Sequence, residues 1–87
     1  MYNIIYKNRS IQKGDLMKIS YKKLWKLLID RDMMKKDLLR EAKISTVSMA
    51  KMGKNQNVTT DVLLKVCTAL HCDISDIMEI VEDDEVQ

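Results

Sequence analysis

Residues 35–52, KKDLLREAKISTVSMAKM, decide the fold because they contain two short helical patterns separated by a tight turn. The first pattern runs from about residue 35 to residue 43. Ser45 then restarts a helix, because its hydroxyl can accept a hydrogen bond from an amide of the next turn. The apolar positions at helical spacing are Leu38, Leu39, Ala42, Met49 and Met52. The pattern predicts two helices that cross steeply through a turn containing Ile44, which is a helix-turn-helix.

The second of these helices has an outward surface of small or basic side chains. Thr46, Val47, Ser48 and Lys51 remain after the apolar positions are assigned to the interior. Such a surface could enter a DNA major groove about 12 Å wide, where bulky side chains would block entry. The sequence therefore favours a nucleic-acid reader over a catalyst.

Helical spacing continues on both sides of this stretch. A first helix is predicted over residues 21–31 with Ser20 as its cap. Gly53, in a left-handed conformation, is predicted to end the helix that begins after Ser45, which we call the reading helix. A long helix capped by Thr59 or Thr60 follows. Asp73 then opens a capping box for a last helix whose inward positions are Ile74, Ile77, Met78 and Val81. No strand is predicted from Ser20 onward, so the fold class is a compact, all-α, five-helix domain.

The chain has 87 residues, enough for one core but not for two. Its charge is unevenly distributed, although the formal net charge is only +2. Residues 1–16 carry three basic and one acidic side chain, residues 17–72 twelve and five, and residues 73–87 none and seven. A basic body with an acidic end favours a polyanionic partner, although charge alone fits a solvated surface equally well.

Three segments are predicted: an extension over residues 1–17, a helical domain over 18–81 and an acidic tail over 82–87. YNIIY at residues 2–6 could form a short strand. Alternatively, translation could begin at Met17, because residues 13–17 can be encoded as a ribosome-binding sequence followed by a start codon. No membrane span or signal peptide is indicated, so we expect a cytoplasmic protein.

The pattern at residues 35–52, the MGK at 52–54 and VTTDVLLKVCTALHCDISDIMEI at 58–80 together resemble the Cro and phage-repressor type of helix-turn-helix regulator. The resemblance implies a lambda-repressor-like fold whose second and third helices bind double-stranded DNA, in most relatives as a repressor. It implies base-edge contacts from Thr46, Val47 and Lys51. The phosphate contacts it implies are Lys35, Lys36, Ser45, Ser48, Lys54 and Asn55. Where this sequence has Leu39 and Lys43, relatives often have a small residue and a glycine.

Several alternatives remain open from the sequence. Val47 could be a packing residue, and Cys67, His71 and Cys72 could be read as zinc ligands, although no fourth ligand follows and reduced core thiols are favoured. No cofactor and no enzymatic site is predicted, because the motifs of such sites are missing. The same helices could instead form a protein-interaction module or an antitoxin. Relatives commonly bind as homodimers, for which residues 2–6 or Ile77, Ile80 and Val81 could supply the surface.

Overall fold

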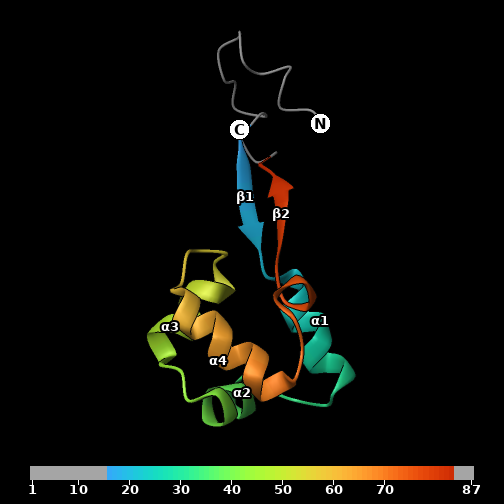
Figure 1. Cartoon of the computed structure of the whole chain (residues 1–87), viewed down its shortest axis with the longest axis vertical. Helices are drawn as coiled ribbons and strands as arrows, with labels where there is room; N and C mark the ends of the chain where they lie inside the picture. Colours follow the sequence, from blue (N-terminus) through green and yellow to red (C-terminus); the bar gives the residue numbers. More distant parts are fainter. Residues whose placement is uncertain (1–15, 84–87) are drawn as a thin grey trace, which may run out of the picture.

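The computed structural model describes residues 16–83, which form four α-helices, one 3₁₀-helix and two β-strands (Figure 1). The strands stand together at one end of the helical body. In chain order the elements are β1 (Met17–Ser20), α1 (Lys22–Asp30), α2 (Lys35–Ala42), α3 (Thr46–Gly53), α4 (Thr60–Leu70), η3 (Ile74–Asp76) and β2 (Glu79–Glu82).

The helices α1 to α4 lie where the apolar spacing predicted them, but Ser20, predicted to cap the first helix, ends β1, and Tyr21 is the N-cap of α1. The N-termini of α3 and α4 show how local sequence sets the start of a helix. The Ser45 hydroxyl accepts a hydrogen bond from the Ser48 amide at 3.0 Å. The Thr59 hydroxyl accepts one from the Val62 amide at 3.2 Å. Each bond satisfies an amide that has no partner within its helix. Local sequence therefore sets where these helices begin.

One apolar core joins all four helices to the segment after α4. Its buried side chains are Tyr21, Leu24, Leu28, Leu38, Ala42, Ile44, Met49, Met52, Leu63, Val66, Leu70 and Ile77. Removing a large apolar side chain from water stabilises the folded state by roughly 1.5–3 kcal/mol. This shared burial holds α2 and α3 in a fixed relation to α1 and α4.

The segment after α4 differs from the prediction. Asp73 does form the expected capping box, since its amide donates to Asp76 Oδ2 at 2.9 Å. The helix nevertheless stops after three residues, and β2 follows where a fifth helix was predicted. Ile77 is completely buried, whereas Ile74, also predicted to face inward, is 44% exposed. The predictions of five helices and of no strand after Ser20 are therefore wrong.

The physical reason for this difference lies near the beginning of the described chain. β2 pairs antiparallel with β1, with Met17 opposite Glu82 and Ile19 opposite Ile80. This pairing satisfies backbone groups of residues 79–82 that a short helix would otherwise bond internally. We call the pair β1 and β2 the ribbon. It includes positions 17 and 82, which lie just outside the predicted domain of residues 18–81.

The turns of the body contain residues in the left-handed conformation. Lys43, between α2 and α3, has φ 57° and ψ 44°. The reading helix was predicted to end with Gly53 in that conformation, but Gly53 is the last residue of α3 and its φ is not positive. Asn55, two residues later, adopts the left-handed conformation instead, with φ 56°. Asparagine tolerates this conformation better than most residues with a side chain.

Among residues 16–83, no helix has the length and apolar character needed to cross a bilayer. The YNIIY segment, predicted as a possible strand, lies outside the described residues. The start of translation at Met17 and the division into extension, domain and tail stay predictions.

Candidate nucleic-acid interface

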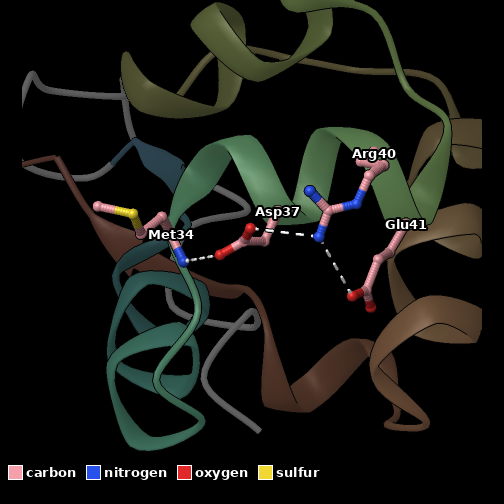
Figure 2. Close-up of polar contacts among 4 residues, drawn as sticks. All are labelled: Met34, Asp37, Arg40 and Glu41. Carbon is pink, nitrogen blue, oxygen red and sulfur yellow. Dashed lines mark hydrogen bonds and ion pairs between the residues drawn. The ribbon is translucent and has the colours of Figure 1, made fainter.

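The start of α2 is fixed by the Asp37 carboxylate (Figure 2). One oxygen accepts the Met34 amide at 2.8 Å and the other accepts Arg40 Nη2 at 3.3 Å. Arg40 also lies 3.9 Å from a carboxylate oxygen of Glu41. The backbone bond from Met34, followed by the charge of Arg40, lowers the pKa of Asp37. Asp37 therefore stays ionised and orders the first turn of α2.

The start of α3 is fixed by a second pair of polar contacts. Besides accepting the Ser48 amide, the Ser45 hydroxyl donates to the Ser48 hydroxyl at 3.1 Å. Both serines were assigned to phosphate contacts by resemblance. The Ser48 hydroxyl keeps its own proton and can still donate to a phosphate oxygen. Ser45 is therefore the cap of α3, and the Ser48 hydroxyl remains as a donor at this end of the helix.

The outward surface of α3 contains the three residues assigned to base-edge contacts. Thr46 and Lys51 are exposed, and Val47 is 63% exposed. The packing interpretation of Val47 is therefore wrong. Met49 and Met52 lie on the opposite side, 7% and 0% exposed. This separation of faces is what a helix needs if it is to rest on the body and still enter a groove.

Ala50 was missed by sequence reasoning. It is exposed and lies beside Thr46 and Val47 on the outward surface, because residues three or four apart share a helix face. A methyl group here can contact the C5-methyl of thymine. The i, i+3 spacing from Val47 was visible in the sequence, but alanine carries no chemistry that draws attention. We call Thr46, Val47, Ala50 and Lys51 the outward stripe from here on.

Exposed cations precede and follow the outward stripe along the chain. Residues 35–55 carry six basic and two acidic side chains. Lys35, Lys36, Lys43 and Lys54 are all exposed. The ammonium of Lys35 lies 4.4 Å from the centroid of the Trp25 ring, a cation–π contact between α2 and α1. The predicted phosphate-binding lysines thus flank the predicted reading helix.

Asn55 has a structural function that its assignment as a phosphate contact did not include. Its Oδ1 accepts a hydrogen bond from the Tyr21 amide at 3.0 Å, and the Tyr21 hydroxyl donates to the Gln56 carbonyl oxygen at 3.0 Å. These bonds tie the loop after α3 to the junction between β1 and α1. The Asn55 amide group still has two N–H donors that could meet a phosphate. Sequence could not reveal the link because its partners are 34 and 35 positions apart.

Cys67 and Cys72 are free, half-buried thiols near the end of α4. Burial, followed by the proximity of Cys72, raises the pKa of Cys67 to about 11. The pKa of Cys72 is also raised by burial. Thiolates, not thiols, bind metals. Among residues 16–83, no cluster of three or more His, Cys, Asp or Glu side chains is placed to hold a metal ion. The geometry does not support the zinc interpretation.

The profile of the Cro/C1-type HTH DNA-binding domain matches residues 23–83. The crystal structure of the transcriptional regulator VanUg, Form II, is similar to this chain, with 45% sequence identity and a TM-score of 0.75. The similarity covers 88% of this chain and 100% of that one. No match was found among curated proteins. With its helix-turn-helix formed by α2 and α3, this chain belongs to the family of Cro/C1-type HTH DNA-binding domains.

Proposed function

We propose that this protein is a transcriptional repressor that places α3 in the major groove of double-stranded DNA. The observation that carries the proposal is the outward stripe of α3, whose small and basic side chains are exposed while Met49 and Met52 anchor the helix in the core. VanUg, the similar solved structure, is described as a transcriptional regulator. Bound in a promoter, a domain of this size would exclude other proteins from the same groove.

Within the outward stripe, different side chains would contact different chemical groups on the base edges. Lys51 can donate to the O6 and N7 acceptors of guanine, and the Thr46 hydroxyl can donate or accept. Val47 and Ala50 offer methyl groups to thymine. No arginine, glutamine or asparagine stands on the outward stripe, so bidentate readout by those side chains is absent from it. We therefore expect modest sequence discrimination, supplemented by the shape of the site.

Outside the outward stripe, phosphate contacts would set the position of the domain on the duplex. Lys35 and Lys36 lie at the start of α2, Ser45 and Ser48 at the start of α3, and Lys54 and Asn55 after α3. Such contacts carry little sequence information but supply much of the affinity. Log affinity falls linearly with log salt concentration, and each lysine that neutralises a phosphate should make this slope steeper by about 0.9.

The test is binding to fluorescently labelled fragments selected from the source genome, measured by anisotropy across a series of salt concentrations. Lys51→Glu reverses a charge on the outward stripe. Lys26→Glu makes the same change in net charge on α1, where Lys26 is exposed and lines a surface hollow together with Ser75 and Asp76. We expect Lys51→Glu to weaken binding at least about tenfold, and Lys26→Glu to have a much smaller effect.

Equal weakening by both substitutions would mean that the protein is attracted to DNA only through its overall charge. Failure of the wild-type protein to bind any fragment would contradict the proposal. It would favour the alternative that the same helices form a protein-interaction module or an antitoxin. Repression itself is tested by a reporter placed behind a bound fragment, whose expression should fall when the protein is produced.

We also propose that the protein binds DNA as a homodimer, because two reading helices about 34 Å apart can enter successive turns of the groove. Of the apolar residues considered for the dimer surface, Ile77 is completely buried and therefore unsuitable, whereas Ile80 is 56% exposed. Residues 2–6 lie outside those described. Light scattering with and without a palindromic fragment tests this proposal, and one protein copy per footprint would contradict it.

A further inference from the structure

Lys35, the first residue of α2, differs from its neighbour Lys36 in its surroundings. The Lys35 ammonium lies 4.4 Å from the centroid of the Trp25 ring, whereas Lys36 is exposed on the same turn and is not stacked on a ring within residues 16–83. The ring belongs to α1 and packs against the apolar core. Trp25 is therefore a fixed surface, and the cation resting on it is restrained.

The same ammonium also approaches the end of the reading helix. A Cβ atom built on Gly53, the last residue of α3, would lie 4.0 Å from Lys35 Nζ. The cation thus sits where α1, the start of α2 and the end of α3 meet. Because Gly53 has no side chain, nothing from that position covers the ammonium on the side of α3.

We propose that Trp25 is a positioning residue that holds the Lys35 ammonium ready for a phosphate of DNA bound to α3. This inference rests on the proposed function. A free lysine side chain samples many rotamers and must be ordered when it binds. The face of an indole ring attracts a cation while leaving its other sides open to an anion. Trp25 orders the Lys35 side chain before DNA binds. A carboxylate in its place would neutralise the charge of the ammonium, whereas the ring leaves that charge available.

Lys35 and Lys36 were equivalent in the sequence, but they should contribute to DNA binding in different ways. Lys35 should contribute an ordered phosphate contact that depends on Trp25. Lys36 should contribute a contact that is independent of the ring. Trp25 itself need not touch DNA, so its contribution should disappear when Lys35 is removed.

The experiment is a double-substitution cycle on DNA affinity, measured by anisotropy at a series of salt concentrations with the fragment that the wild-type protein binds. The single variants are Trp25→Leu, Trp25→Phe and Lys35→Gln, and the double variant combines Trp25→Leu with Lys35→Gln. A matched cycle uses Lys36→Gln in place of Lys35→Gln. Thermal unfolding of each variant establishes that it is folded at the assay temperature.

We expect Lys35→Gln to weaken binding and to make the fall of log affinity with log salt concentration shallower, by about one in the slope. Trp25→Leu should weaken binding about two- to fivefold when Lys35 is present and scarcely at all when it is absent. Trp25→Phe, which keeps an aromatic face, should retain most of the affinity. In the matched cycle, Trp25→Leu and Lys36→Gln should act additively.

A purely structural role for Trp25 would make Trp25→Leu weaken binding equally with and without the Lys35→Gln substitution. This result would overturn the inference while leaving the proposed function intact. An unchanged salt slope in Lys35→Gln would do the same. If either of these results is found while Lys51→Glu still weakens binding, the role proposed for Trp25 is wrong but α3 still binds DNA. Absence of wild-type binding would overturn both proposals.

A second readout does not need DNA. Trp25 is the only tryptophan of the chain, so its fluorescence reports directly on the ring's environment. Lys35→Gln should change the emission of the free protein, whereas Lys36→Gln should leave it unchanged. Identical spectra for the wild type and Lys35→Gln would contradict the cation–π contact on which the inference depends.

Discussion

The helical body and the ribbon obtain their structures from different ranges of the sequence. In the body, each helix buries one stripe of apolar residues, and α3 and α4 begin at residues that cap them, so interactions within about four residues define them. The ribbon joins residues 17–20 to residues 79–82, and neither strand has a partner nearby in the chain. The helices of the surface proposed to bind DNA are therefore locally encoded, whereas the connection between the ends of the domain is not.

The largest effect expected from this comparison is in the core of the body. Leu38 in α2 is completely buried, whereas Ile80 in the ribbon is 56% exposed. Leu38→Ala should lower the free energy of unfolding by about 2–5 kcal/mol, because it leaves a cavity as well as removing apolar contact. Ile80→Ala should change it by no more than about 0.5 kcal/mol. Urea unfolding followed by circular dichroism measures both, and equal losses would show that the ribbon is as important to stability as the body.

The next effect concerns the link between body and ribbon. Tyr21→Phe removes the hydroxyl that donates to the Gln56 carbonyl oxygen and keeps the buried ring. We expect a loss of about 0.5–1.5 kcal/mol in the free energy of unfolding. Amide hydrogen exchange should also increase more in the ribbon, at Glu79 and Val81, whose amides face β1, than in α4. Unchanged exchange in the ribbon would mean that this bond does not transmit order between the two regions.

A smaller effect of opposite sign is expected in the turn of the helix-turn-helix. Lys43 is left-handed, a conformation that costs roughly 1–2 kcal/mol for most residues with a Cβ. Lys43→Gly should remove this cost but lose some of the gain through the entropy of the unfolded chain. We therefore expect a net stabilisation of about 0.5–1 kcal/mol, measured by urea unfolding. Destabilisation would show that the lysine side chain makes a compensating contact.

The effect that is smallest at neutral pH comes from Cys67, because it appears only in alkaline solution. The pKa of Cys67 is raised from 9.0 to about 11, mainly by burial. The folded state therefore favours the protonated thiol, and the stability linked to it is complete below pH 9 and declines as the pH rises towards about 11. Tyr21, whose pKa is also raised by burial, contributes in the same direction above pH 10. Cys67→Ala should flatten the decline in thermal unfolding temperature, and an unaltered decline would contradict this assignment.

Sequence predicted the four helices because apolar periodicity and capping are local signals, and it placed Thr46, Val47 and Lys51 on the surface where they are found. It missed the ribbon because the capping box at Asp73 is equally compatible with a 3₁₀-helix. The adjacent β-branched residues Ile80 and Val81 were the available sign of a strand. Its meaning depended on β1, at the other end of the described chain.

In the candidate interface, sequence missed the contacts that cross between elements. Nothing near Lys35 in the chain indicates the Trp25 ring, and nothing near Asn55 indicates the Tyr21 amide. Such contacts arise only when helices pack, so they follow from the three-dimensional arrangement and not from spacing. The residues that would touch DNA were therefore easier to predict than those that hold them in place.

The central claim is that the body, through α3, binds DNA. It is tested most directly by recording backbone amide chemical shifts of the labelled protein while a bound genomic fragment is added. We predict the largest changes at Thr46, Val47, Ala50 and Lys51, with smaller ones at Lys35 and Lys36 and little change in the ribbon. The largest changes in residues 17–20 and 79–82, with α3 unaffected, would contradict the claim.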